Sequence, residues 1–475
     1  MEENTRSRPH LILLSSPGTG HLIPVLQLCK RLVMLCNFDV TTFVVGSNSS
    51  EAETQIIQPA RSSKLCRIVE LPAVDISVLF DPGAAVVTRI CVMMREIRPA
   101  LRSAVLAFKV RPAAFIVDHF GTESFGVAEE LGIPKFVYIP SNAWFLALLA
   151  YLPVLDKEVK GEYLDQKEPL QIPGCMSVRP EDVIDPMLDR TDQQYLECVR
   201  IAKEIASGDM ILLNTWEDLE STALLAIREG ELLGGVVKKR VFPIGPLTRP
   251  VGPSGVKSEL CVWLDEQPKQ SVIYVSFGSG GTLSQEQMTE LAWGLELSRQ
   301  RFIWVVRPPT IGGGDESFFT AGNVSDDISV YLPCGFLTRT QGVGLLVPQW
   351  GPQVDILGHP SVGGFLTHCG WNSVLESITN GVPMIVWPLY AEQRMNATLL
   401  TEELGVAVRT EVLPSKGVVG RTEIQNLIKR IMVEEEGTML RSRVKEFKNS
   451  AEKALAEGGS SDNALSEVAN VCQIK

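Results

Sequence analysis

Short apolar runs alternate with longer amphipathic segments along the first half of the chain. HLILLSS (10–16), FDVTTFVVG, AAFIVDHF, KFVYIP and DMILLNT have the length and composition of buried strands, and LIPVLQLCKRLVML has the periodicity of a helix. This alternation predicts parallel strands joined by helices. It weakens at FPIGPLTRPVGPSG (242–255), where proline and glycine are dense, as in a linker between domains.

The alternation then restarts, with SVIYVSFGSGG (271–281), RFIWVV, GLLVPQW, GGFLTH and PMIVWPL as the strand-like runs. We therefore predict an α/β protein of two facing, doubly wound, Rossmann-like domains with an interdomain crevice that receives the ligands. The N-terminal domain would span 1–245, the linker 246–258 and the C-terminal domain 259–475. The last helix is a candidate to pack back on the N-terminal domain.

Length, net charge and cysteine pattern limit the number of domains, the kinds of partner and the cellular compartment that we expect. A chain of 475 residues is long for one core, which favours two domains. Its formal net charge of −12 at pH 7 disfavours nucleic acid or an acidic membrane as a partner. The ten cysteines form no C-x-x-C pair, which is typical of free thiols in a reducing compartment. No apolar run is long enough to span a bilayer, and the first residues lack a signal-peptide pattern, so we expect a cytoplasmic protein.

The densest polar cluster lies where a predicted strand meets a predicted helix. In FLTHCGWNSVLESITNGVPMIVWP (365–388), the buried run is followed by a helical segment that ends before Gly381. Backbone N–H groups at the start of a helix are unpaired and favour an anion. His368, Trp371, Asn372, Ser373 and Glu376 cluster at this crossing, which is therefore a candidate place to hold an anion.

Two glycine turns follow the strands that open the two halves. SPGTGH (16–21) resembles part of a dinucleotide fingerprint, but Ile23 occupies the third glycine position and the second strand lacks an acidic residue at its end. An NAD enzyme is therefore disfavoured. FGSGG (277–281) precedes a helix in which Ser284 and Gln287 have capping-box spacing. Such turns are common in α/β domains.

The segment from Trp350 to Gln393 resembles the plant secondary-product signature of family 1 UDP-sugar-dependent glycosyltransferases, because several fixed spacings match at once. SPGTGH and the two-domain layout extend the resemblance. SPGTGHLIPV, VDHFGTESF and YVSFGSGGTLS are most similar to the hydroquinone and phenylpropanoid glucosyltransferase branch. The resemblance implies a GT-B fold, a UDP-sugar donor and a small aromatic acceptor.

The resemblance also implies roles for the matching residues of the C-terminal half. Trp350 would stack on uracil, and Gln353 and Glu376 would bind the ribose hydroxyls. The diphosphate would be held by Ser279, His368, Asn372 and Ser373, and the sugar would face Trp371, Glu392 and Gln393. Gln393 is similar to that of glucose-preferring members, whereas Glu392 stands where many members have Asp, which leaves the sugar choice open.

Two residues of the N-terminal half are candidates for catalysis. His21 ends the first glycine turn and Asp118 ends the strand AAFIVD, so both are expected at the carboxyl edge of one sheet. A neutral His21 would act as general base for a phenol, while Asp118 fixes its tautomer and stabilises the imidazolium. The reaction would be one displacement with inversion at the anomeric carbon and UDP leaving. The alternative role of Asp118 is to cap the helix that follows it.

Six residues in loops and helix-like segments are candidates to line an acceptor pocket, although aromatic residues at helical spacing are equally typical of a core. They are Phe80, Phe120, Trp144, Phe145, Leu389 and Tyr390. We interpret His119 as pocket wall or solvated turn. No D-x-D run is present, so we expect neither a metal ion nor a cofactor besides the co-substrate UDP-glucose. We also expect a monomer.

The function predicted from the sequence is transfer of glucose from UDP-glucose to a phenylpropanoid, simple phenol or flavonoid. Transfer to nitrogen, sulfur or carbon on the same scaffold stays open. Two other classes are weighed against it. A UDP-sugar epimerase would need acidic catalysts in place of a His–Asp pair, and a non-catalytic UDP-sugar-binding protein would be expected to lack His21 or Asp118.

Overall fold

The computed structural model describes residues 8–45, 51–62, 65–76, 78–81, 83–234, 237, 240–249, 259–310 and 328–473. The chain divides into two compact units that are not contiguous in sequence. Unit 1 comprises Met1–Ser177, Pro186–Thr248 and Lys453–Lys475, and unit 2 comprises Val178–Asp185 and Arg249–Glu452. The predicted linker, 246–258, lies outside the described residues from position 250 onward.

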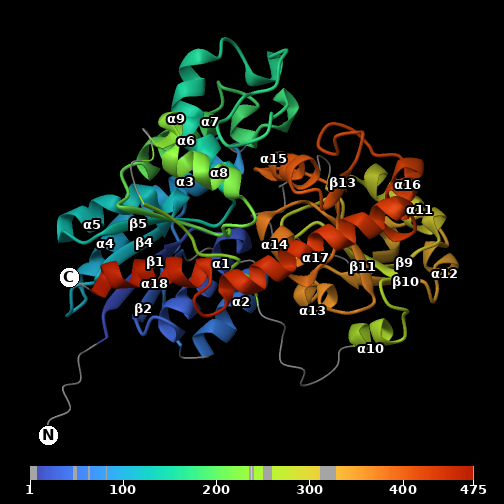
Figure 1. The fold of residues 1–475 in the computed structure, drawn as a ribbon, viewed down its shortest axis with the longest axis horizontal. Coiled ribbons are helices and arrows are strands. Elements are labelled where there is room, and N and C mark those ends of the chain that lie inside the picture. The colour runs from blue at the N-terminus through green and yellow to red at the C-terminus, as the bar shows by residue number, and fades with distance from the viewer. Residues whose placement is uncertain are drawn as a thin grey trace, which may run out of the picture. The chain divides into compact units, whose positions relative to one another are not determined.

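Unit 1 is built on a parallel sheet, coloured blue to green in Figure 1. In spatial order its strands are β3 (Arg67–Leu71), β2 (Asp39–Val45), β1 (His10–Ser15), β4 (Ala114–Asp118), β5 (Lys135–Ile139), β6 (Met210–Leu213) and β7 (Arg240–Pro243). The order reverses between β1 and β4, where Leu14 pairs in register with Val117. Ligands of open parallel sheets bind at the carboxyl ends of the strands at such a switch point.

The central strands β1, β4, β5 and β6 of this sheet are buried almost along their whole length, which is why they are continuous apolar runs rather than alternating ones. The helices of unit 1 are α1 (Thr19–Met34), α2 (Glu51–Ser62), α3 (Val86–Glu96), α4 (Arg98–Leu106), α5 (Phe125–Leu131), α6 (Ala143–Glu158), α7 (Gln193–Ile205), α8 (Ser221–Glu229), α9 (Glu231–Gly234) and α18 (Ser460–Gln473), with short 3-10 turns η1 (His119–Ser124), η2 (Tyr163–Asp165) and η4 (Asp185–Met187). From the C-terminal end of the sequence, α18 packs Leu465 and Val468 into the core that holds Leu11 and Leu13 of β1.

Unit 2 has a second parallel sheet, with strands in the order β10 (Gly344–Pro348), β9 (Arg301–Val306), β8 (Val272–Ser276), β11 (Val362–Thr367), β12 (Met384–Val386) and β13 (Ala407–Arg409). Its switch point lies between β8 and β11. The helices are α10 (Glu259–Asp265), α11 (Gln285–Ser298), α12 (Phe336–Arg339), α13 (Gln353–Leu357), α14 (Trp371–Asn380), α15 (Gln393–Thr398), α16 (Arg421–Met432) and α17 (Glu435–Leu455), with 3-10 turns η3 (Pro180–Asp182) and η5 (Ile328–Tyr331) and the π-helical turn η6 (Leu399–Glu403).

Two predicted helix ends can be compared with the structure. Gly381, with a φ of 76°, ends α14 in the left-handed conformation that glycine adopts readily. Ser284 caps α11, and its hydroxyl accepts from the N–H of Gln287 at 3.1 Å. The reciprocal half of the capping box is wrong, because the Gln287 side chain bonds the backbone of Val419 instead, donating at 3.1 Å and accepting at 2.8 Å.

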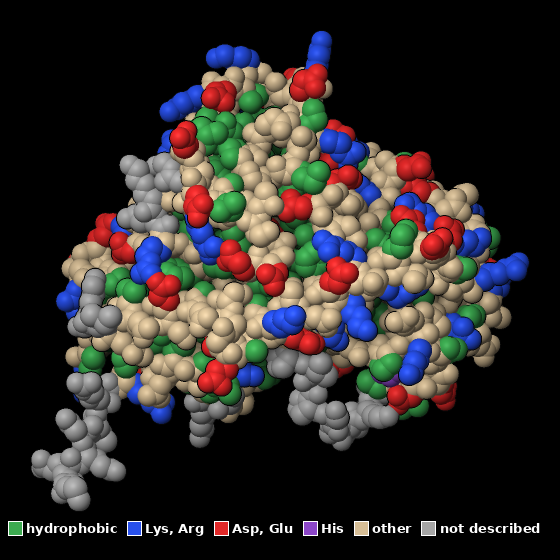
Figure 2. Space-filling view, viewed as in Figure 1, with side chains coloured by type: hydrophobic (Ala, Val, Ile, Leu, Met, Phe, Trp, Pro, Cys, Tyr) green, Lys and Arg blue, Asp and Glu red, His purple; other side chains and the backbone are tan. Residues whose placement is uncertain are grey.

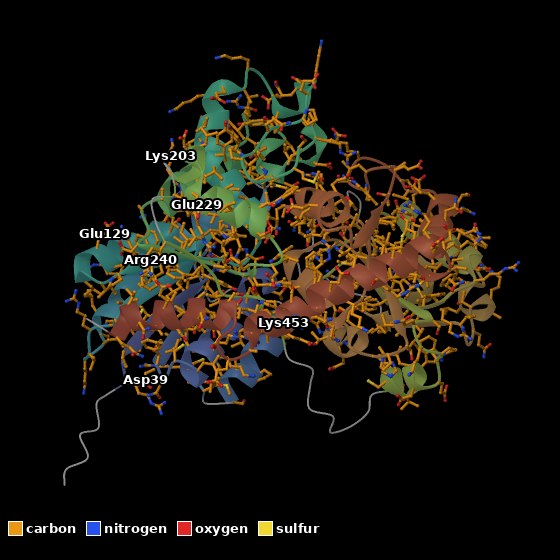
Figure 3. All side chains as sticks on the ribbon, viewed as in Figure 1. Asp39, Glu129, Lys203, Glu229, Arg240 and Lys453 are labelled. Atoms are coloured by element: carbon orange, nitrogen blue, oxygen red, sulfur yellow. The ribbon has the colours of Figure 1, made fainter. Side chains whose placement is uncertain are left out.

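Charged side chains are mostly at the surface. On the face shown in Figure 2, acidic and basic side chains are interspersed. The six charged residues labelled in Figure 3, Asp39, Glu129, Lys203, Glu229, Arg240 and Lys453, are all exposed. Buried charged groups are therefore the informative exceptions, and they include Asp118, Asp182, Glu376 and Arg394. Within the described residues, no helix has both the length and the apolar character needed to cross a membrane.

Candidate active site

The switch point of unit 1 brings His21 and Asp118 together. After β1 the chain turns at Gly18, whose φ of 97° is a conformation that favours glycine, and α1 then begins. His21 lies in the first turn of α1, and its Nδ1 is 3.2 Å from Oδ2 of Asp118, the last residue of β4. The geometry at Nδ1 of His21 does not meet that of a hydrogen bond, so we describe its contact with the Asp118 carboxylate as electrostatic.

The Asp118 carboxylate is fully buried and held by several donors. Ser16 donates its N–H to Oδ2 at 2.7 Å and its hydroxyl to Oδ1 at 2.5 Å, and the N–H groups of Phe120 and Gly121 donate to Oδ1 at 3.2 Å. Burial raises the pKa of Asp118, but His21, His119 and the hydroxyl of Ser16 outweigh it and lower the pKa below its ordinary value. Asp118 therefore caps η1, as the alternative interpretation expected, and the same charged carboxylate faces His21.

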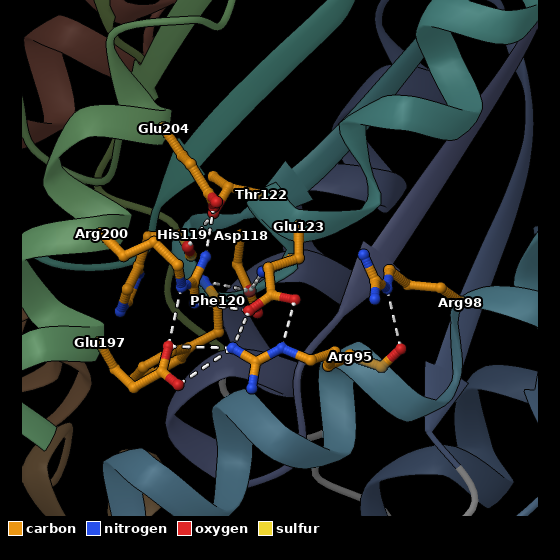
Figure 4. A network of polar contacts seen from close by, with 11 residues as sticks. Arg95, Arg98, Asp118, His119, Phe120, Thr122, Glu123, Glu197, Arg200 and Glu204 are labelled. Carbon is orange, nitrogen blue, oxygen red and sulfur yellow. Dashed lines mark hydrogen bonds and ion pairs between the residues drawn. The ribbon is translucent and has the colours of Figure 1, made fainter. Parts of the chain in front are cut away.

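A network of ion pairs anchors η1, the turn that follows Asp118 (Figure 4). The carboxylate of Glu123, in η1, accepts from Nε and Nη2 of Arg95 in α3 at 3.0 and 2.6 Å. Nη2 of Arg200 in α7 lies 2.9 Å from the same carboxylate. Because two cations from different helices hold one acid, η1 is fixed to α3 and α7, and the carboxylate that caps it is fixed with it.

An aromatic cluster surrounds His21. The His119 ring centre lies 5.2 Å from that of His21, 4.3 Å from Phe120 and 5.5 Å from Phe145, and the Phe120 ring centre is also 5.2 Å from that of His21. His119 is only 7% exposed, so the solvated-turn interpretation is wrong. Burial lowers the pKa of His119 to about 3, so its imidazole is neutral at pH 7. Of the predicted acceptor-pocket residues, Phe120 thus adjoins the predicted base directly, and Phe145 adjoins its neighbour His119.

The other four acceptor-pocket candidates do not join this cluster. Trp144 has no exposed surface, which favours a place in the core over the pocket wall that we predicted. Phe80 lies beside the guanidinium of Arg89, 5.5 Å from it. Leu389 and Tyr390 belong to unit 2, where Leu389 is buried in the core and Tyr390 packs against it.

In unit 2, the ends of β8 and β11 form a second cluster around His368. The ring is 8% exposed, and its Nε2 lies so close to two glycines that a Cβ on either Gly278 or Gly370 would stand 2.5 Å from it. Gly278 also has a φ of 73°. These two turns therefore require glycine. Burial, with a contribution from Arg307, lowers the pKa of His368 to about 4, so this imidazole is also neutral at pH 7.

Arg307 is a residue of this cluster that the sequence analysis missed. It directly follows β9, and its Nη1 donates to the backbone carbonyl of Ser279 and, at 3.5 Å, to that of Gly281. Its guanidinium forms no ion pair with a carboxylate among the described residues. A charged residue directly after the apolar run FIWVV is the signal that could have identified it, because strand ends face ligand sites in such sheets.

The residues predicted to bind the nucleoside lie just before α13 (Trp350), at its start (Gln353) and in α14 (Glu376). Nε2 of Gln353 donates to Oγ of Ser373 at 2.9 Å and to Oε2 of Glu376 at 2.7 Å. The Glu376 carboxylate, 2% exposed, also accepts from Nε of Arg249 at 3.1 Å. The same guanidinium lies 5.6 Å from the ring centre of Trp350. Arg249 is a second residue that the sequence analysis missed, and no local pattern marks it.

The residues predicted to face the sugar lie at the starts of two helices. Trp371 and Asn372 are the first two residues of α14, and Trp371 is 3% exposed. Glu392 is the N-cap of α15 and Gln393 its first residue. Oε1 of Gln393 accepts from the backbone N–H groups of Leu389 and Tyr390, at 2.9 and 3.1 Å. The oxygen of this amide therefore faces the preceding turn, and its Nε2 points away from that turn. An amide N–H₂ that donates and a carboxylate that accepts suit a ligand rich in hydroxyls.

The described residues contain no group of three or more His, Cys, Asp or Glu side chains that could hold a metal ion. The two candidate clusters, one in each unit, bring together imidazoles, buried carboxylates, arginines and helix N-termini. Such groups can take up a proton, hydrogen-bond hydroxyls and stabilise an anion.

Comparisons with known proteins identify the family. The family model described as "UDP-glucoronosyl and UDP-glucosyl transferase" matches residues 257–448. Anthocyanidin 3-O-glucosyltransferase 5 of Manihot esculenta is 66% identical over 464 residues, which are 98% of this chain and 95% of that protein. Hydroquinone glucosyltransferase of Rauvolfia serpentina is 44% identical over 464 residues, 97% of each chain.

A solved structure extends the likeness to the fold. TcCGT1 in complex with UDP superimposes with a TM-score of 0.93 and 48% identity, covering 98% of this chain and 100% of that one. The predicted fold class, an α/β protein of GT-B type with two doubly wound sheets, is confirmed. The chain therefore belongs to the plant family 1 UDP-dependent glycosyltransferases, enzymes that transfer a sugar from a UDP-sugar.

Proposed function

We propose that this enzyme transfers glucose from UDP-glucose to a hydroxyl of a small phenolic acceptor, with inversion at the anomeric carbon. The observation that carries the proposal is the contact between His21 and the buried, charged Asp118 at the switch point of unit 1. Relatives named for glucosylating an anthocyanidin and hydroquinone support the acceptor class, which comprises phenylpropanoids, simple phenols and flavonoids.

In this proposal His21 is the general base. With Nδ1 toward Asp118, Nε2 is the nitrogen available to take the proton of the acceptor hydroxyl. The phenolic oxygen forms a bond to the anomeric carbon as the bond from that carbon to the diphosphate oxygen breaks, and UDP leaves with the electron pair. Asp118 stabilises the imidazolium that forms. Phe120 and Phe145 would pack against the aromatic ring of the acceptor.

The donor site would use the cluster in unit 2. Uracil would stack on Trp350, and Gln353 and Glu376 would bind the ribose. Arg249 pairs with the buried Glu376 carboxylate and so fixes its position, and carboxylate oxygens accept hydrogen bonds from hydroxyls. His368, Asn372, Ser373 and the turn at Ser279 would hold the diphosphate at the N-terminus of α14.

Charge on the leaving group would be balanced by Arg307. Burial lowers the pKa of His368 to about 4, so in the protein without its donor this imidazole is neutral at pH 7 and offers a hydrogen bond but no positive charge. The guanidinium beside the glycine turn supplies the charge. Trp371, Glu392 and Gln393 would face the sugar, with glucose preferred. The proposal assigns no step to a metal ion.

Acceptors of graded acidity test the role of His21. We expect His21→Ala to lower kcat with UDP-glucose by about 10²–10⁴-fold for weakly acidic phenols. The loss should shrink for strongly acidic phenols, which are partly ionised already and need the base least. The matched control is His359→Ala, because His359 contacts Asp265 outside both clusters, and it should leave kcat unchanged. A loss that is small throughout, or independent of acceptor pKa, would exclude His21 as the base.

A further inference from the structure

A segment from the first half of the sequence folds as part of unit 2. This segment, Val178–Asp185, is anchored there by Asp182, whose side chain has no exposed surface. Its Oδ2 accepts from Nη1 of Arg409 at 3.0 Å and from Oγ1 of Thr398 at 3.1 Å. A buried carboxylate with a cationic partner and a hydroxyl partner is well satisfied, so the segment is firmly attached.

The last residue of the segment, Asp185, contacts the turn that carries the predicted sugar-facing residues. Its Oδ2 accepts from the N–H of Ala391 at 2.6 Å, and its own N–H donates to the carbonyl of Ala391 at 3.1 Å. Ala391 has a φ of 56°, in the left-handed region that residues with a Cβ rarely adopt. Asp185 thus engages both backbone groups of a strained residue directly before Glu392.

Asp185 also holds the other side of this turn. Its Oδ1 pairs with Nη2 of Arg394, which directly follows Gln393. The Arg394 side chain is 3% exposed, and its Nε donates to the carbonyl of Val183 in the same segment at 3.1 Å. Glu392 and Gln393 therefore lie between two residues that are bound to one carboxylate.

We propose that Asp185 is a positioning residue that sets the sugar selectivity of the enzyme. The inference rests on the proposed role of Glu392 and Gln393 in binding the sugar. Without Asp185, Ala391 is free to relax out of the left-handed region, and the Glu392 carboxylate and Gln393 amide lose their mutual position. Discrimination between hexoses that differ at one hydroxyl depends on that position, whereas the predicted uridine diphosphate contacts on α13 and α14 do not.

The experiment compares Asp185→Ala and Asp185→Asn with the wild-type enzyme. For each protein, kcat and KM are measured with UDP-glucose and UDP-galactose and one phenol, and the Kd of UDP is measured by calorimetry. We expect Asp185→Ala to lower kcat/KM for UDP-glucose by about 10-fold or more and to bring the preference for glucose close to unity, with the Kd of UDP within about twofold of wild type. Asp185→Asn can still accept from the N–H of Ala391 but lacks the charge that pairs with Arg394. Its kcat/KM for UDP-glucose and its glucose preference should therefore lie between those of the wild type and of Asp185→Ala.

Asp182→Asn is the matched control, because Asp182 anchors the same segment through Arg409 and Thr398 rather than through the turn at Ala391. It should keep the glucose preference. Selectivity that survives in both Asp185 variants, or an equal loss in Asp182→Asn, would overturn the role of Asp185. If Asp185→Ala does not fold, the glucose preference of Asp185→Asn is the measurement that tests the role of Asp185. A wild-type enzyme without a glucose preference would instead contradict the proposed function of Glu392 and Gln393.

Discussion

Substitution of Gly278 by alanine tests whether the position of His368 controls binding of the diphosphate. Two effects are expected. The φ of 73° places the new Cβ in the left-handed region, which costs about 1–2 kcal/mol of stability. The Cβ would also stand 2.5 Å from Nε2 of His368, and since such contacts are essentially never below 3.0 Å, the ring must retreat by about 0.5 Å or more.

The two effects can be separated with a second glycine of unit 2. Gly342 has a φ of 79°, but a Cβ there meets nothing within 4 Å. Gly342→Ala should therefore show the backbone cost alone, a fall of about 2–8 °C in the unfolding midpoint. Gly278→Ala should show that cost together with the displacement of His368.

Calorimetry with UDP and with uridine measures how the displacement of His368 in Gly278→Ala changes ligand binding. A lost hydrogen bond to a charged group is worth about 1.5–3 kcal/mol, so we expect Gly278→Ala to bind UDP about 10- to 150-fold more weakly. Uridine, which lacks the diphosphate, should bind as it does to the wild type. A folded Gly278→Ala protein with wild-type affinity for UDP would refute the reasoning, as would an equal loss in Gly342→Ala.

Two further predictions concern the base-stacking residue and the buried histidines. Trp350→Ala should weaken binding of UDP and uridine alike, by about 1–3 kcal/mol in calorimetry, and a loss confined to UDP would contradict stacking on uracil. Burial lowers the pKa of His119 to about 3 and that of His368 to about 4. In the unfolded chain both pKa values return to the ordinary 6.5, so at a pH below 6.5 the unfolded chain binds more protons than the folded one. The stability that these neutral histidines contribute is therefore complete above pH 6.5. It is lost as the pH falls toward 3 for His119 and toward 4 for His368, at about 1.4 kcal/mol per pH unit for each. His119→Gln should reduce that slope in urea unfolding, and an unchanged slope would mean that the folded protein protonates His119.

Local pattern was sufficient for the elements that carry the site. The strand-like runs ending near Ser15 and Asp118 correspond to β1 and β4, and the glycine after the helix from Trp371 ends α14. These features depend on neighbours along the chain, since burial on both faces needs an unbroken apolar run and a left-handed helix end needs glycine.

Pattern was insufficient wherever one side chain had two possible partners. The spacing of Ser284 and Gln287 predicted a capping box, but Gln287 bonds Val419, which is 132 residues away. Asp118 was expected either to cap a helix or to face His21, and it does both. For His119 and Trp144, the sequence does not contain the information on which face of the turn or helix becomes the interior.

The sequence by itself thus determined the two α/β sheets, the glycine turns and the family signature, because each is encoded by residues close together in the chain. Only the tertiary structure showed that Arg307 bonds the turn at Ser279 and that Asp185 bonds Ala391 across 206 residues. The physical reason is that strand order and segment docking decide which distant groups meet. A charged side chain leaves water for the interior only where such a partner is in place.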